Sequence, residues 1–237
     1  IPGGPKLVRI DLTRNTVERV YAFTPDIAPA DSYLNDVRID PQHRAAYITD
    51  SGNGALVVVN LDTGTARRLL DEHPSTHSEG IVIVIDGSPW LRPDGSRPDV
   101  HADGIALDSE GRYLYYHALT GSSLYRIETA ALRNARMTPD ALARRVQFLG
   151  RTGPCDGLLY GSGDRIYHTS LEHNAIRSYS PGNAMETVVS DPRLAWPDTL
   201  ARGPQGWIYV TTSQIHRMPA PDTPFRIFRF RPDIDGN

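Results

Sequence analysis

Four polar residues hold the same place in an internal repeat, and they are the side chains of this sequence best suited to shared chemistry. Asn35, Asp103, Asp156 and Asp198 are each followed by an apolar residue two positions later and by a tyrosine eleven or twelve positions later. If the repeat brings these four side chains to one site, three carboxylates and an amide converge there. Carboxylates gathered in a partly dry site repel one another, so some must take up protons or a cation must join them.

Three interpretations of this group remain open from the residues alone. Calcium suits it, because Ca²⁺ prefers several oxygen ligands and tolerates irregular geometry. A bound metal could then polarise a lactone carbonyl or activate a water, with one of the carboxylates as general base. Alternatively, the positive charge of a bound organic amine would neutralise the carboxylates, and no catalysis would take place. Alternatively, each acid only accepts hydrogen bonds from backbone amides at the start of a strand.

Two ring-bearing residues lie beside these positions. His101 comes two residues before Asp103 and could carry protons near neutral pH; the alternative is a loop histidine bonded to backbone. Trp196 comes two residues before Asp198 and could stack on a ring-shaped ligand, although packing in the core is the simpler role. The single cysteine, Cys155, excludes an internal disulfide. We expect it to be a buried structural thiol.

The spacing within the repeat predicts the elements that hold these residues. A second apolar position lies nine residues beyond each repeat tyrosine, and the two sets are Tyr47, Tyr115, Tyr167 and Tyr209, then Leu56, Leu124, Ile176 and Met218. Short alternating apolar runs separated by turn residues are typical of antiparallel strands. Such a unit cannot cover its own apolar face, and stacking units around an axis buries those faces. The sequence therefore predicts an all-β protein, a β-propeller.

The repeat also predicts how many blades the chain holds. Leu7 in KLVRIDL parallels Leu56 in ALVVVNL, so we expect the chain to begin in the middle of a blade. Residues 1–237 then form a single propeller domain of about four and a half blades. This is a six-bladed type that lacks one to two N-terminal blades. The run Phe225–Phe230 is the last strand, expected to close the ring with an N-terminal segment.

Two stretches interrupt the strand pattern. Thr138 followed by Pro139 and Asp140 is typical of a helix start, and residues 129–134 are also helix-permissive. The run from Asp86 to Val100 is rich in proline, glycine and aspartate, which predicts an exposed loop. Insertions of this kind often shape the mouth of a site.

Composition excludes several classes of protein. Hydrophobic residues make up 39% of the 237 residues, which is enough for a core, and the longest apolar run, Ile81–Ile85, is far too short to span a bilayer. A net charge of −3 excludes the strongly basic surface of a nucleic-acid-binding protein. We therefore expect neither a nucleic-acid partner nor a membrane span.

Several segments carry a family resemblance. SYLNDVRID, YITDSGNGALVVVNLDTG, ADGIALDSEGRYLYYHALTGSSLYRI and WPDTL together resemble the yellow / major royal jelly protein family, in its bacterial branch, over almost the whole chain. The resemblance implies a six-bladed propeller, generally secreted, which in some members binds small molecules in its central channel. More distantly, the NDV and DGIAL segments are similar to the gluconolactonase / regucalcin family.

The more distant resemblance implies roles for three residues. In the lactonases an Asn, an Asp and a Glu hold a divalent metal at the top of the channel. Asn35 falls at their substrate-contacting Asn, Asp103 where they carry a metal-binding Asn, and Asp156 at their metal-binding Asp. Asp103 departs from that pattern, and the glutamate of the lactonases lies in a first blade, which we expect to be missing from these 237 residues.

We therefore expect a secreted protein, extracellular or periplasmic, that binds a small molecule in its channel, with Ca²⁺ as the candidate ion and no organic cofactor. The candidate ligand-binding residues are Asn35, Asp103, Asp156, Asp198, His101 and Trp196, and the first four are also the candidate metal ligands. A metal-dependent lactone hydrolase and a non-catalytic extracellular interaction protein are the alternatives.

Overall fold

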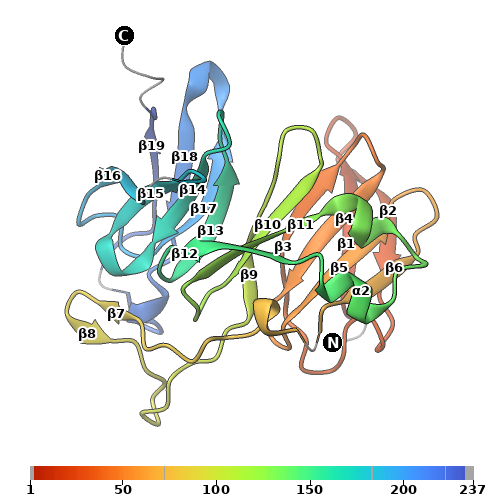
Figure 1. Cartoon of the computed structure of the whole chain (residues 1–237). Coiled ribbons are helices and arrows are strands. Elements are labelled where there is room, and N and C mark those ends of the chain that lie inside the picture. Colours follow the sequence, from red (N-terminus) through yellow and green to blue (C-terminus); the bar gives the residue numbers. More distant parts are fainter. Residues whose placement is uncertain (1–2, 72, 183, 222, 233–237) are drawn as a thin grey trace.

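The computed structural model describes residues 3–71, 73–182, 184–221 and 223–232. Antiparallel strands dominate. Apart from a small hairpin at residues 84–89, their sheets follow one another in chain order from the N-terminal to the C-terminal end of the arc (Figure 1). Three sheets have four strands each: β3 (Leu34–Asp40), β4 (Ala45–Asp50), β5 (Ala55–Asn60) and β6 (Ala66–Leu69); β9 (Ala102–Leu107), β10 (Tyr113–Ala118), β11 (Ser123–Glu128) and β12 (Gln147–Arg151); β13 (Cys155–Tyr160), β14 (Ile166–Ser170), β15 (Ala175–Tyr179) and β16 (Glu186–Ser190).

Three smaller sheets complete the described strands: β17 (Pro197–Arg202), β18 (Ile208–Thr212) and β19 (Arg226–Phe230); β1 (Lys6–Asp11) and β2 (Thr16–Ala22); and the hairpin β7 (Val84–Ile85) and β8 (Ser88–Pro89). The first strands of successive large sheets, β3, β9, β13 and β17, lie next to one another. Sheets that radiate from neighbouring first strands are the blades of a β-propeller. The predicted all-β propeller is therefore confirmed, with four blades and the two-stranded sheet β1–β2 among the described residues.

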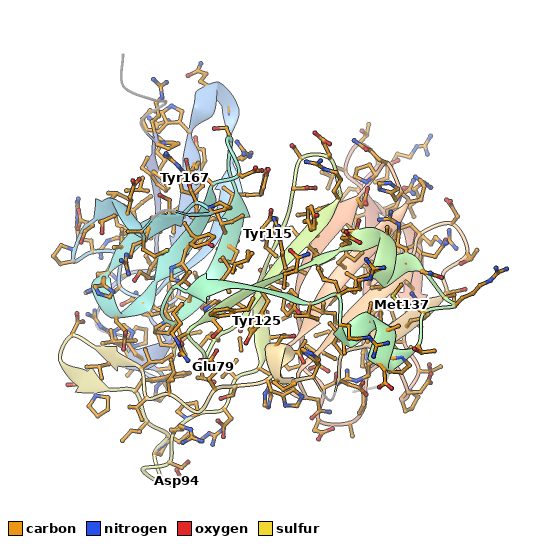
Figure 2. All side chains as sticks on the ribbon, viewed as in Figure 1. Glu79, Asp94, Tyr115, Tyr125, Met137 and Tyr167 are labelled. Carbon is orange, nitrogen blue, oxygen red and sulfur yellow. The ribbon has the colours of Figure 1, made fainter. Side chains whose placement is uncertain are left out.

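The core lies in layers between blades, and the repeat tyrosines explain why. Tyr47 packs between the β3–β6 and β9–β12 blades, Tyr115 between the β9–β12 and β13–β16 blades, and Tyr167 between the β13–β16 and β17–β19 blades. All three are at most 3% exposed. Figure 2 shows Tyr115 near the middle of the molecule, between two sheets, and Tyr167 in the C-terminal part. Each repeat thus buries its aromatic residue only when the next blade covers it.

The N-terminal sheet has the register that the repeat predicts. Leu7 pairs with Tyr21, just as Leu56 pairs with Leu69 on the last strand of its blade. Leu7 packs against the cluster between β1–β2 and the next blade. The pairing and packing of β1 and β2 therefore resemble those of the third and fourth strands of the next blade.

The assignment of Met218 was wrong. Met218 follows a short 3-10 helix and is 49% exposed, and the third strand of its blade is β19. Ile227 pairs with Thr211, as Leu56 pairs with Thr49 and Ile176 with Thr169. The loop between β18 and β19 is longer than in the other blades, so an apolar residue at the repeat spacing lies in the loop instead of the strand.

The described residues do not show the expected closure of the ring by the last strand. Among them, β19 pairs only with β18, and β1 pairs only with β2. The two sheets lie at opposite ends of the arc in Figure 1.

The two interruptions of the strand pattern are as predicted. Helices α1 (Thr129–Arg133) and α2 (Pro139–Ala143) connect β11 to β12, and the Thr138 hydroxyl caps α2 by accepting from the amide of Ala141. The 86–100 stretch begins with the turn and the short second strand of the β7–β8 hairpin and continues as a loop from residue 90, with Asp94 far from the large sheets (Figure 2). Short 3-10 turns complete the described helices: η1 (Pro74–Thr76), η2 (Leu171–His173), η3 (Pro204–Gly206) and η4 (Ile215–Arg217). None of the described helices is long and apolar enough to cross a membrane.

Candidate functional site

The four repeat positions share a backbone feature, a β-bulge in the first strand of the blade. In β3 the pairing passes from Leu34 with Asp50 to Val37 with Ile48, so two residues of β3 face one residue of β4. The same shift occurs in the other three blades, and the bulged pairs are Asn35–Asp36, Asp103–Gly104, Asp156–Gly157 and Asp198–Thr199. A bulge bends its strand and re-aims a side chain. The bulge therefore changes the direction of the Asp or Asn side chain in each blade, so that it no longer follows the alternation of the strand.

A threonine hydroxyl holds the bulge in three of the four blades. Thr169 Oγ1 accepts from the amides of Asp156 (3.2 Å) and Gly157 (2.8 Å). Thr49 accepts from the amide of Asp36 in the same way, and Thr211 accepts from that of Thr199. The fourth blade has His117 at this place. In these three blades the threonine comes two residues after the repeat tyrosine, so the sequence itself carries this signal.

Two of the bulges contain glycine because the first strands run very close together. A Cβ on Gly104 would collide with the carbonyl oxygen of Asp156, and a Cβ on Gly157 would collide with that of Asp198. Glycine at the second position of these bulges lets neighbouring backbones approach closely. The close approach brings the acids of three blades to one place.

Five of the six predicted site residues meet around one cavity of about 450 Å³, His101 being the exception. Asn35, Asp103, Asp156 and Asp198 all line it, as the repeat predicts. The other lining residues are Tyr33, Asp36, Ser51, Trp90, Val100, Leu119, Trp196, Thr199 and Ile215. None of these described lining residues carries a basic side chain. The cavity is thus lined by both acidic side chains and apolar or aromatic ones.

Two of the acids are buried, and their pKa values reflect it. Burial raises the pKa of Asp103 well above its ordinary value, and the nearby carboxylates of Asp156 and Asp36 raise it further. Burial likewise raises the pKa of Asp156 well above its ordinary value, and Asp198 adds to the shift. Loss of hydration penalises a charged carboxylate, and neighbouring negative charges do the same. A cation bound in the cavity would offset the repulsion between the neighbouring carboxylates.

The buried acids hold fixed partners. Asn35 Nδ2 donates to Asp103 Oδ1 (2.7 Å) and to Ser51 Oγ (3.1 Å), which ties the β3 blade to the β9 blade. Trp196 Nε1 donates to Asp156 Oδ2 at 2.5 Å. These bonds orient one oxygen of each carboxylate and leave the others for a ligand.

Asp36 is a site residue that the sequence analysis did not identify. It lies directly after Asn35, at the second position of the bulge, and lines the cavity. Burial raises its pKa, whereas the Arg38 guanidinium, 3.7 Å away, lowers it. Arg38 also donates to the carbonyl of Leu158 in another blade (3.1 Å). Asp36 therefore has a partial counter-charge, which the other acids of the cavity lack.

Trp196 lines the cavity, but it is fully buried. Its ring stacks on His216 at a centroid distance of 5.9 Å, and Trp90 packs edge-on against it at 4.8 Å. The indole therefore serves as a packed donor to Asp156 in this geometry. Trp90, from the 86–100 loop, is the aromatic residue that the sequence analysis missed, although it predicted that this loop shapes the site.

His101 does not line the cavity. Its Nδ1 accepts from the amide of Ser78 (2.9 Å), and its ring lies edge-on to His77 at 4.8 Å. Burial and the neighbouring His77 lower its pKa. The structure thus places His101 as a loop histidine bonded to backbone, the alternative that the sequence left open.

Comparison with solved structures shows the same fold. The chain is similar to a streptogramin B lyase (TM-score 0.53, 14% identity, 95% of this chain and 61% of that one), to a luciferin-regenerating enzyme (0.56, 13%, 91% and 66%) and to a gluconolactonase from Xanthomonas campestris (0.54, 12%, 87% and 62%). The chain therefore spans less than two thirds of the length of each of these structures. A comparison with curated protein sequences gives no significant match.

The family comparison is more specific. The profile of the major royal jelly protein family matches residues 1–233, nearly the whole length of the sequence. The same residues form the repeat, the bulges and the cavity described above. The chain belongs to the major royal jelly protein family.

Proposed function

We propose that this chain is part of a secreted, six-bladed propeller that binds a small organic cation in the cavity where its first strands meet. One observation carries the proposal: four carboxylates line the cavity, and no basic side chain is found among its described lining residues. Family membership supports the blade number and the secretion.

The size and walls of the cavity favour an organic ligand over a bare ion. A volume of about 450 Å³ lies within the range of about 300–1,000 Å³ typical of small-molecule pockets. Tyr33, Trp90 and Ile215 offer apolar surface in the same cavity as the acids. An ammonium group would neutralise the carboxylates while an attached ring covers the apolar wall. A cationic head near an aromatic face gains further attraction.

A pair of probes tests this proposal. Phenethylamine and 2-phenylethanol share a ring and differ in charge, and isothermal titration calorimetry measures the binding of each. We expect only the amine to bind. Asp156→Asn should weaken it about tenfold or more, because a hydrogen bond to a charged group contributes about 1.5–3 kcal/mol and each 1.4 kcal/mol is about a factor of ten.

The matched control is Asp62→Asn, which removes an exposed carboxylate paired with Arg44 outside the cavity. It should leave the affinity unchanged, and circular dichroism should show that both variants are folded. Equal binding of the amine and the alcohol, or full affinity in Asp156→Asn, would refute the proposal.

A metal-dependent lactone hydrolase is the second candidate, and one observation favours it. Asn35, Asp103, Asp156 and Asp198 bring oxygen donors to the same cavity, and such donors suit Ca²⁺. The ion would supply a Lewis acid for a lactone carbonyl. Hydrolysis of glucono-δ-lactone that chelation abolishes and calcium restores would favour this candidate. Absence of turnover and of both amine and calcium binding would favour the non-catalytic interaction protein.

A further inference from the structure

A second cluster of functional groups lies outside the acidic cavity. His117 on β10, Cys155 at the start of β13 and His168 on β14 come from two adjacent blades. One ligand atom from each residue lies within 4.8 Å of the other two, and all three side chains are buried, at 0–1% exposure. The two imidazole rings meet edge-on at 5.8 Å.

Backbone carbonyls determine which ring nitrogens carry the protons. His117 Nδ1 lies 2.6 Å from the carbonyl oxygen of Ala118, and His168 Nε2 lies 3.1 Å from that of Gly153. A carbonyl only accepts, so these nitrogens are the donors. In the neutral rings, His117 Nε2 and His168 Nδ1 then carry the lone pairs. Both of these atoms are buried, and neither has a hydrogen-bond partner among the described residues.

The unpaired nitrogens need an explanation, because a buried polar atom without a partner is costly. The thiol of Cys155 has a single proton, and in the structure it is directed to the carbonyl oxygen of Gly157 (3.9 Å). A metal ion would satisfy both nitrogens and the sulfur together. In known metal sites, ligating histidines commonly donate their other N–H to a backbone carbonyl, which fixes the tautomer as it is fixed here.

We propose that His117, Cys155 and His168 bind a thiophilic transition-metal ion, with Cu(I) the best fit. Thiolate and imidazole ligands select copper and zinc over calcium. Structural zinc sites are four-coordinate, whereas two imidazoles and one thiolate form the trigonal ligand set of copper sites. Binding replaces the Cys155 proton with the metal, so one proton is released for each ion bound.

The geometry requires only a small movement. Zinc binds histidine nitrogen at about 2.0 Å and cysteine sulfur at about 2.3 Å, and we use these distances for the site. The distances between the three ligand atoms, now up to 4.8 Å, must therefore shorten by about 1 Å. The ligands come from two blades, so the ion would join the β9–β12 blade to the β13–β16 blade. Because the site is buried, we expect the ion to enter as the protein folds.

The experiment refolds the full chain from denaturant under anaerobic, reducing conditions with Cu(I), with Zn(II), or with neither ion. Bound metal is then measured after desalting, and affinity by competition with a chromophoric chelator. We expect one Cu(I) per chain, one proton released and a higher melting temperature. Cys155→Ser and His168→Gln should each weaken Cu(I) binding by more than about 100-fold. Loss of a residue that only hydrogen-bonds a metal ligand weakens binding by about 10- to 100-fold, and loss of a ligand should weaken it more.

The control variant is His43→Gln, whose half-exposed ring pairs with Asp40 and should not affect binding. If a ligand variant does not fold, cobalt provides a readout from wild type alone, since Co(II) bound by a thiolate gives a strong charge-transfer absorption. Stoichiometric zinc without copper binding would overturn the assignment of copper. Absence of copper, zinc and cobalt binding, or full affinity in Cys155→Ser, would overturn the site itself.

Discussion

Replacement of Thr169 by valine tests whether the threonine hydroxyls hold the bulges that aim the acids. Valine has the shape of threonine but no hydroxyl group. Thr169 is fully buried, and its oxygen accepts from the amides of Asp156 and Gly157. The substitution therefore leaves two buried donors without an acceptor while the packing stays nearly the same.

The expected loss of stability follows from these two bonds. A buried donor left unpaired costs about 1–3 kcal/mol, and the lower half of that range applies because the bulge can partly relax. Two donors then lower the free energy of unfolding by about 2–4 kcal/mol. At about 2–4 °C per kcal/mol for a chain of this size, the melting temperature should fall by about 4–16 °C.

Thermal and urea unfolding followed by circular dichroism measure this change. Thr169→Ser keeps the hydroxyl and should recover most of the stability and the affinity for phenethylamine. Thr187→Val, on the exposed side of β16, should change stability by less than about 0.5 kcal/mol. The reasoning fails if Thr169→Val is as stable as wild type, or if serine destabilises as much as valine.

Two further predictions concern the buried acids and the glycine beside them. The raised pKa values of Asp103 and Asp156 mean that the folded state retains protons which the unfolded state releases above about pH 4, so without added cations their contribution to stability should be lost as the pH rises towards 7. Burial lowers the pKa values of His117 and His168 to about 4 and about 3, so these two residues make stability rise with pH and oppose the effect of the acids. The melting temperature of wild type and of Asp156→Asn should therefore be measured against pH, and the two slopes compared. Equal slopes would contradict the raised pKa of Asp156. Gly157→Ala should destabilise the protein and weaken phenethylamine binding, since its Cβ collides with the backbone of the next first strand; an unchanged melting temperature would show that the strands are not so closely packed.

The repeat was a reliable guide to the fold because its signals are local. Tyr47, Tyr115 and Tyr167 recur at spacings that place them at equivalent points of successive sheets, and each is buried against the following blade. The equivalence also predicted that Asp103 and Asp156 share a cavity. It failed at Met218, because a longer loop in that blade moves the third strand further along the chain.

The direction of individual side chains could not be predicted in the same way. His101 is two residues from Asp103, yet it turns away from the cavity to accept from the Ser78 amide. The meeting of His117 with Cys155 is equally hidden in the sequence, since these residues lie on strands of different blades. Which face a side chain occupies also depends on the neighbouring blade, and the contacts with that blade are not encoded near the residue.

The identity of the strands, their order and the acidic character of the cavity thus follow from the order of residues along the chain, because alternation and turns act over a few residues. The aromatic wall of Trp90, the partial neutralisation of Asp36 and the unpaired nitrogens of the histidines arise only when the blades pack. They depend on distances between segments far apart in sequence, and those distances result from the close approach of the first strands at Gly104 and Gly157.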